Sequence, residues 1–206
     1  LIDTYNVLIM VSGNYKFDSK TLEKIKNWIS KGNTLITIGT SNNWIIKNKI
    51  VKEELVVKKK DTLNIKYERH PYVDAAENIG RDKLGGVFLE VNIDKSHPIA
   101  FGYKDKNQVV YKNNLVWLKP SKNSYSNIAL YTKKPHIDGY ISKNIRRDYL
   151  PKSASIIYSK VEKGRVIMFA DNPNFRGTAY GTNRLFLNSI FMSDHIQIPL
   201  SNQSAK

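Results

Sequence analysis

The sequence contains no cysteine, and this absence excludes several kinds of chemistry at once. Disulfide bonds, thiolate metal ligands and a cysteine nucleophile all require that side chain. Long apolar runs are also missing, since stretches such as Val7–Val11 and Val166–Ala170 fall far short of the roughly 20 residues that a membrane-spanning helix needs. We therefore expect no membrane span and no thiol-dependent reaction.

Acidic residues are few compared with basic ones. The 18 Asp and Glu residues are outnumbered by 33 Lys and Arg residues, which gives a formal net charge of +15. Such a charge can attract polyanions. The longest basic run is Lys58–Lys60, however, and no recognised nucleic-acid-binding module accompanies the charge. We do not expect nucleic acid as a partner, and a basic polyanion-binding module remains an alternative.

The length and apolar content are those of an ordinary globular chain. With 206 residues, 41% of them hydrophobic, the chain can form one sizeable core. It contains no internal repeat and no low-complexity linker. We expect one α/β domain over residues 1–195, with a β-rich inserted section over about 86–160, and a polar tail over 196–206.

The N-terminal quarter predicts a strand, a helix and a second strand. Tyr5–Val11 is a mostly apolar run of strand length. The helix that follows begins at Asp18 or Ser19, has Leu22, Ile25, Trp28 and Ile29 on one face, and ends at Gly32. Thr34–Ile38 then predicts a buried strand parallel to the first, with a right-handed crossover. A short helix is expected over Ser41–Lys49.

The rest of the chain favours strands. Residues 72–82 predict an irregular loop, and Thr182–Met192 predicts a well-buried final helix because it is apolar around much of its circumference. Gln108–Lys112 and Asn114–Leu118 predict a hairpin. The other expected strands are Gly86–Ile93, Asn127–Thr132, Gly139–Ser142, Ala154–Ser159 and Arg165–Ala170.

Two sets of segments resemble known families. The N-terminal strand, helix and strand lead to Gly39-Thr40-Ser41, which resembles the layout of class I glutamine amidotransferase-like domains around their nucleophile elbow. The second set resembles the amidotransferase-like domain that follows the peptidase domain of certain bacterial zinc carboxypeptidases, mostly from Bacteroidetes. It consists of Tyr72–Ala75, Leu84–Gly86, Asp94–Tyr103, Gly139–Ser142, Gly164–Gly177 and Tyr180–Asn188.

The resemblance implies an amidotransferase-like, flavodoxin-like layer with a largely parallel sheet. It also implies an N-terminal truncation, because such domains have a further strand and helix before the segment that matches Tyr5–Val11. The chain would be the C-terminal part of a secreted or periplasmic zinc carboxypeptidase. Its expected partners are that peptidase domain and a peptide or cell-surface ligand. Zinc is expected in the peptidase domain, and no cofactor is expected in this chain.

Acyl-transfer chemistry on this fold needs a nucleophile, a histidine base and an acidic residue that orients the base. Without cysteine, the weak candidates are the hydroxyls of Thr40 and Ser41, with His97 as the base. The glycines of a G-x-S-x-G elbow are incomplete, and Ser41 fits a helix cap equally well. His97 lies between Asp94 and Pro98, a pattern typical of a turn closed by side chains. A Ser- or Thr-dependent hydrolase remains an alternative, and no residue is assigned as catalytic.

The histidines do not form a recognisable zinc motif. A carboxypeptidase site needs His-x-x-Glu and a distant histidine, and none of His70, His97, His136 and His195 has a glutamate three residues after it. A new site made of His70, Asp74 and Glu77 is an alternative, although nothing in the sequence determines its geometry. We expect no metal in this chain.

The segment Asp171–Arg184 is the richest in polar side chains. It follows an apolar strand, and ligands of open α/β sheets gather at the carboxyl ends of strands. Arg176 and Arg184 could hold a carboxylate there. Alternatively, these arginines pair with Asp74 or Asp171 in an internal network, and Phe175 and Tyr180 are packing anchors. The candidate ligand-binding or structural cluster comprises Asp74, Asp171, Asn172, Asn174, Arg176, Tyr180, Asn183 and Arg184.

The absent thiol, the absent zinc motif and the resemblance favour the same function. We expect a non-catalytic accessory domain of a secreted zinc metallocarboxypeptidase-like protein. It would support the peptidase domain or bind a peptide or surface ligand through the Asp171–Arg184 segment.

Overall fold

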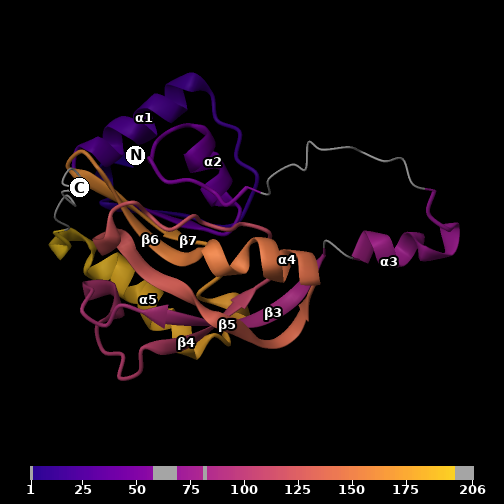
Figure 1. Ribbon diagram of the computed structural model, residues 1–206. Coiled ribbons are helices and arrows are strands. Elements are labelled where there is room, and N and C mark those ends of the chain that lie inside the picture. Colours follow the sequence, from indigo (N-terminus) through magenta and orange to yellow (C-terminus); the bar gives the residue numbers. More distant parts are fainter. Residues whose placement is uncertain (1, 58–68, 81–82, 198–206) are drawn as a thin grey trace, which may run out of the picture.

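The computed structural model describes residues 2–57, 69–80 and 83–197, which form one mixed β-sheet with helices on both faces (Figure 1). The sheet order is β1-β2-β7-β6-β5-β3-β4. The strands are β1 (Val7–Met10), β2 (Thr34–Ile38), β3 (Leu84–Ile93), β4 (Asn107–Lys112), β5 (Asn127–Ile141), β6 (Ala154–Val161) and β7 (Gly164–Phe169). The α-helices are α1 (Ser19–Ser30), α2 (Ser41–Lys47), α3 (Ala75–Gly80), α4 (Lys143–Asp148) and α5 (Tyr180–Phe191).

Short 3-10 helices connect several of these elements. They are η1 (Ile2–Thr4), η2 (Tyr72–Asp74), η3 (Pro98–Ala100), η4 (Ser124–Ser126), η5 (Leu150–Lys152), η6 (Phe175–Gly177) and η7 (Ser193–His195).

The α/β class is confirmed, and the sheet has two parts. β1, β2 and β7 run parallel, whereas β6, β5, β3 and β4 continue the same sheet with antiparallel neighbours. The largely parallel sheet expected from the sequence therefore describes only β1, β2 and β7. The β-rich section is an extension of that sheet rather than a separate layer.

The N-terminal βαβ unit forms as the sequence predicts. Asp18 caps α1 by accepting a hydrogen bond from the Thr21 backbone N–H at 2.7 Å. Trp28 and Ile29 are almost fully buried against the sheet, as the amphipathic pattern requires. Gly32 follows the helix with φ +123°, a conformation that favours glycine.

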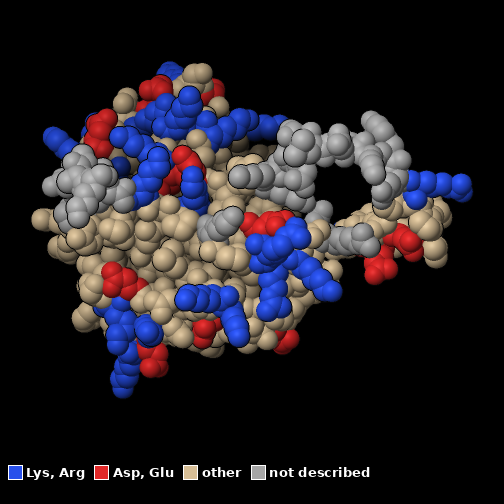
Figure 2. All heavy atoms as spheres, viewed as in Figure 1, with Lys and Arg blue, Asp and Glu red and all other residues tan. Residues whose placement is uncertain are grey.

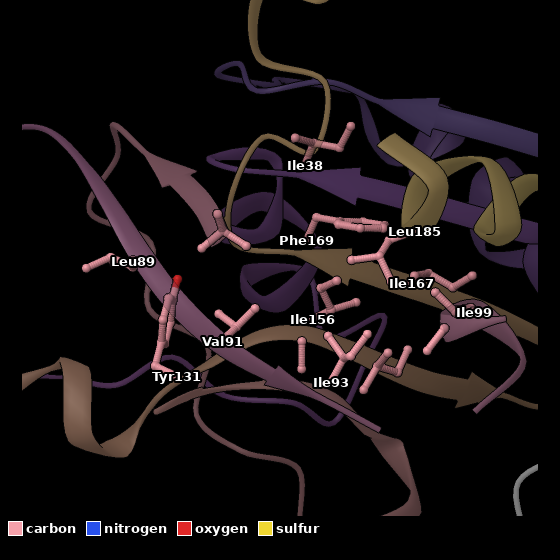
Figure 3. Packing of buried hydrophobic residues seen from close by; sticks show 14 of the residues in the cluster. Ile38, Leu89, Val91, Ile93, Ile99, Tyr131, Ile156, Ile167, Phe169 and Leu185 are labelled. Atoms are coloured by element: carbon pink, nitrogen blue, oxygen red, sulfur yellow. The ribbon is translucent and has the colours of Figure 1, made fainter. Parts of the chain in front are cut away.

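Two apolar clusters pack on opposite faces of the sheet. One contains residues of α1 and α2, such as Trp28 and Ile45, with Leu35 and Val166 of the sheet. The other combines Leu185 of α5 with alternate sheet residues, including Ile38, Ile167 and Phe169 (Figure 3). Because side chains alternate along a strand, β2 and β7 contribute to both clusters.

Some local predictions are wrong. The expected loop over residues 72–82 contains η2 and α3, and Figure 1 shows α3 set apart from the sheet. The expected hairpin does not form, because β4 pairs with β3 and Leu118 makes single bridges to Leu55 and Ala154. Residues 81–82, 58–68 and 198–206 lie outside the described residues, so the tail and the basic run Lys58–Lys60 are not tested.

Two further predictions need correction. The strands expected at Asn127–Thr132 and Gly139–Ser142 are parts of one long strand, β5, which is irregularly paired with β3 around Pro135. Proline is tolerated at such a bulge, where a ladder N–H is not needed. The final helix is less buried than expected, since Leu187 and Phe191 are 44% and 76% exposed.

Candidate functional site

The turn between β2 and α2 corresponds to the elbow of the expected layout, and its left-handed residue is a glycine. Gly39 has φ +59°, and its N–H donates to the Phe169 carbonyl at 2.8 Å. A Cβ added at this position would lie 2.9 Å from Ser12 Oγ and 3.1 Å from Ser12 Cβ. In a nucleophile elbow, the reactive side chain projects from this strained turn. Here that position has no side chain, and Ser12 fills the adjacent space.

The two hydroxyls next to Gly39 are engaged in local hydrogen bonds. Ser41 is fully buried, and its Oγ accepts from the Ile38 N–H at 2.8 Å and lies 2.9 Å from the Met10 carbonyl. This bonding joins the end of β2 to β1. Thr40 Oγ1 lies 2.9 Å from Ser12 Oγ and 3.2 Å from the Gly13 carbonyl. Ser41 thus ties the turn to β1. The alternative role expected from the sequence, a helix cap, is wrong, because Ser41 is the first residue of α2, whose N-cap is Thr40 with no capping hydrogen bond from a side chain.

His97 lies in a different part of the molecule from these hydroxyls. It precedes η3, whose Ile99 and Ala100 belong to the α5-side cluster, whereas α2 packs on the opposite face of the sheet. Its Nδ1 accepts from the Ile99 N–H at 3.2 Å, and Asp94 accepts from both the backbone and the hydroxyl of Ser96. The structure therefore does not bring His97 together with Thr40 or Ser41, and the segment forms the turn closed by side chains.

The buried His97 makes stability depend on pH. Burial lowers the pKa of His97 to about 4, and Asp94 only partly opposes this effect. In the unfolded chain, a histidine has a pKa near 6.5. Between pH 6.5 and pH 4, the unfolded chain therefore binds a proton at His97 and the folded chain does not. Stability is therefore retained above pH 6.5 and lost as the pH falls towards 4, by about 3 kcal/mol in total. Denaturant unfolding measured from pH 7 to 4 should show this loss.

The matched variant is His97→Asn. The asparagine side chain can still accept from the Ile99 N–H, because asparagine is a good capping residue, but it does not titrate. We expect the variant to lose less stability between pH 6.5 and 4 than the parent protein. If the free energy of unfolding of His97→Asn fell between pH 7 and 4 by as much as that of the parent protein, this would contradict the assignment of the effect to His97.

A cavity of about 680 Å³ opens beside the elbow, at the carboxyl ends of β1 and β2. The segment after β1 and the helix α2 form its walls. Ligands of open α/β sheets gather at this end of the strands, and the volume is within the usual range for small-molecule pockets. The lining residues are Ser12, Gly13, Asn14, Tyr15, Lys16, Phe17, Thr40, Asn43, Trp44, Lys47 and Asn48.

The lining of this elbow cavity combines aromatic, amide and cationic groups. Phe17 contacts Trp44 edge-to-face at 5.3 Å between ring centroids. Lys16 and Lys47 are exposed, and the cavity lining contains no carboxylate. The sequence interpretation missed this site, although Ser12-Gly13-Asn14 is a turn signal directly after an apolar strand, followed by two aromatics. That strand, β1, is only partly buried, since Ile9 is 39% exposed.

A buried polar network lies behind the elbow, at the same end of the strands. Lys112 is fully buried, and its Nζ lies 3.1 Å from Asp171 Oδ1 and 2.7 Å from the Val116 carbonyl. Tyr131 donates to the Asp171 carboxylate at 2.8 Å, and Ser155 donates to it at 2.5 Å. Asn114 links the network to the elbow, since its Nδ2 donates to the Ala170 carbonyl and lies near Gly39.

The electrostatics of this network indicate a structural role. Burial lowers the pKa of Lys112, and the Asp171 carboxylate opposes that shift. Burial, with the Asp171 charge, raises the pKa of Tyr131 well above its usual range, so that Tyr131 stays a hydrogen-bond donor. The adjacent cavity holds only about 10 Å³, roughly the space of one water molecule. A ligand cannot enter there.

The predicted polar cluster is therefore not one pocket. Arg184 donates to the Gly102 carbonyl at 2.6 Å, and Arg176 lies over the Phe175 ring at 5.3 Å, so the predicted pairing of these arginines with Asp74 or Asp171 is wrong. Asp74 is in η2, beside the α3 segment that stands apart from the sheet (Figure 1).

The remaining members of the cluster are dispersed. Tyr180 is 82% exposed and is not a packing anchor, whereas Phe175 packs on Tyr111 at 4.0 Å between ring centroids. Asn172 accepts from the backbone N–H of Asn174 at 3.0 Å. Asn183 is half-buried in the first turns of α5.

The described residues lack both a metal-binding cluster and a membrane-spanning helix. Within residues 2–57, 69–80 and 83–197, no group of three His, Asp or Glu side chains could hold a metal ion, so His70, Asp74 and Glu77 do not form one. In the same part of the chain, no helix is both long and apolar enough to cross a membrane.

Comparison with known proteins supports the fold. No family model and no curated protein matches the chain. Among solved structures, a ThuA-like protein from Parabacteroides merdae is 12% identical with a TM-score of 0.55, covering 97% of this chain and 74% of its own. A candidate GMP synthase subunit from Thermoplasma acidophilum is 15% identical with a TM-score of 0.53, covering 94% of this chain and 75% of its own.

A second ThuA-like protein, from Bacteroides uniformis, is 13% identical with a TM-score of 0.53 and covers 94% of this chain and 70% of its own. At such low identities the likeness concerns the fold alone. The chain therefore has a class I glutamine amidotransferase-like fold, in which the turn between β2 and α2 carries the left-handed Gly39.

Proposed function

We propose that this chain is a non-catalytic accessory domain that binds the carboxylate end of a peptide in the elbow cavity. The observation that carries the proposal is Gly39: the elbow position has no side chain, and Ser12 occupies the neighbouring space. Ser41 is buried and hydrogen-bonded to backbone groups of β1 and β2. These features support binding without covalent chemistry.

The composition of the elbow cavity supports a peptide carboxylate as ligand. Lys16 and Lys47 supply positive charge without a competing carboxylate in the lining. Phe17 and Trp44 provide an aromatic surface for an apolar terminal side chain. Asn14 and Asn43 can donate to and accept from peptide groups.

The test compares an N-acetylated tripeptide ending in phenylalanine with its C-terminally amidated counterpart. Binding is followed through the indole N–H resonance of Trp44, the tryptophan that lines the cavity. We expect the free carboxylate to bind about ten-fold more tightly, as one charge-assisted contact predicts. Lys47→Ala should remove this preference, and Lys24→Ala, an exposed lysine on α1, should preserve it.

Two results would contradict the proposal. Equal affinity for the two peptides, or no response of Trp44 to either, would exclude carboxylate recognition in this cavity. Hydrolysis of glutamine, an ester or a peptide that disappears in Ser41→Ala would show a catalytic domain. That result would favour the alternative hydrolase instead.

The larger context is part of the same proposal. The segments Asp94–Tyr103 and Gly164–Gly177, with the others named above, support a link to an exported zinc carboxypeptidase, and a domain that holds peptide carboxylates would suit such a partner. The upstream coding sequence tests this link directly. A His-x-x-Glu motif there, with a distant histidine, is the expected result, and an unrelated upstream sequence would remove the peptidase context.

A further inference from the structure

A second cavity, of about 570 Å³, lies at the opposite end of β7 from the elbow. Strands β6 and β7 form one wall, and the chain around η7 forms the other. Its lining residues are Tyr158, Lys160, Lys163, Arg165, Asp194, Ile196 and Gln197. We call it the hairpin cavity, because the β6–β7 hairpin carries all of its cations.

The hairpin cavity has an excess of positive charge. Arg165 is only 9% exposed, and its guanidinium pairs with Asp194. Lys160 and Lys163 are exposed, and among the residues that the structure describes neither has a carboxylate within ion-pair distance. Three cations and one carboxylate leave two positive charges uncompensated.

The strand register holds these charges together. Lys160 is the direct cross-strand partner of Arg165 in the antiparallel β6–β7 ladder. Like charges directly opposite one another destabilise a sheet. Lys163 lies in the two-residue turn between the same strands, where Glu162 has φ +52°. The cations are thus fixed by backbone pairing, rather than gathered by chance from flexible segments.

The guanidinium of Arg165 also has unused hydrogen-bonding capacity. Its Nε is buried without a partner. The Tyr158 residue lines the same cavity, and its hydroxyl lies 3.5 Å from the Ile196 carbonyl and also interacts with the Arg165 side chain. A bound oxyanion would offer acceptors to these donors and to both lysines.

Overall charge does not explain this arrangement. On the face drawn in Figure 2, Lys and Arg occur in several separate groups with Asp and Glu among them. The hairpin cavity differs from such surface lysines because it contains a nearly buried arginine, a concave shape and an in-register cationic pair.

We propose that the hairpin cavity is a binding site for a phosphate or sulfate dianion. The charge of a dianion matches the two uncompensated positive charges, and its oxygens can accept from Lys160, Lys163 and Tyr158. The site is separate from the elbow cavity, so it does not depend on the function proposed there. The ligand is either this free dianion or two neighbouring sulfate groups of a sulfated saccharide chain, each of which carries one negative charge.

The test measures the melting temperature in rising concentrations of sodium phosphate and sodium sulfate, against sodium chloride at equal ionic strength. Equal ionic strength removes general screening from the comparison. We expect a saturable rise with the dianions, because a ligand that binds the folded state stabilises it. The variant Lys160→Ala/Lys163→Ala should weaken the apparent affinity about ten-fold or more, as lost charge-assisted contacts predict.

The control variant Lys20→Ala/Lys24→Ala removes the same charge from α1, where both lysines are exposed, and should keep the parent affinity. A single variant, Lys160→Gln, gives an independent signature. Without added dianion it should melt at a higher temperature than the parent protein, because the cross-strand repulsion with Arg165 is gone.

The two sources of the anionic groups are separated by comparing inorganic sulfate with a sulfated tetrasaccharide. Tighter binding of the saccharide, lost in Lys160→Ala/Lys163→Ala, assigns the site to a sulfated chain. Equal or weaker binding assigns it to the free ion. The proposal is overturned if the dianions stabilise the protein no more than chloride does, or if both double variants respond alike.

Discussion

Replacing Asp171 with asparagine should lower the free energy of unfolding by about 3–5 kcal/mol, the usual cost of leaving a fully buried charge without its partner. The asparagine keeps an acceptor for Tyr131 and Ser155, so the main loss is the charge opposite Lys112, whose Nζ is 3.1 Å from the carboxylate. Urea unfolding monitored by tryptophan fluorescence is the measurement.

The control for this prediction is the double variant Lys112→Met/Asp171→Asn. It removes both charges and leaves the Val116 carbonyl without its lysine donor, a cost of about 1–3 kcal/mol. The double variant should therefore be more stable than Asp171→Asn alone. If the double variant lost as much stability as the two single variants together, the two side chains would not act as an ion pair.

The second large effect is expected at Gly164, where β7 begins. A Cβ there would lie 1.9 Å from the Ile29 carbonyl oxygen and 2.6 Å from that of Asn33, both backbone atoms. The end of α1 must therefore move away from the sheet to accept any side chain. We expect Gly164→Ala to destabilise the protein by about 3 kcal/mol, the upper end of usual overpacking costs, as measured by denaturant unfolding.

Gly181 provides the matched control. It lies in α5 with no atom within 4 Å of an added Cβ and without a positive φ. Alanine should stabilise the helix there by up to about 1 kcal/mol. If Gly164→Ala were as stable as Gly181→Ala, the close contact between α1 and β7 would be wrong.

The N-terminal unit was predictable because its signals are local. Thr34–Ile38 is a short strand of isoleucine, leucine and threonine that is buried on both faces, and Asp18 caps α1 within the first turn. The later strands were harder to delimit, because their pairing depends on distant partners. Two separate strands were expected at Asn127–Thr132 and Gly139–Ser142, yet β5 continues through Pro135 at an irregularity in its pairing with β3.

The sites were less predictable than the fold. Lys112 and Asp171 are 59 residues apart, and pairing in space cannot be deduced from such spacing. One signal was present: Lys112 has the same strand parity as the buried Val110, so its side chain faces the core and requires a partner. The hairpin cavity depends on the register that sets Lys160 opposite Arg165, which composition alone does not reveal.

The placement of β7 between β2 and β6 also has a kinetic consequence. β6 and β7 form a tight hairpin, whereas the contacts of β7 with β2 and α2 join distant segments, as in the bond between Asn42 and Phe169, 127 residues apart. Closing long loops delays such contacts in folding. We expect the antiparallel half to fold first and the βαβ unit, with its elbow, to dock last. Amide hydrogens of β1 and β2 should then gain protection later in refolding than those of β6.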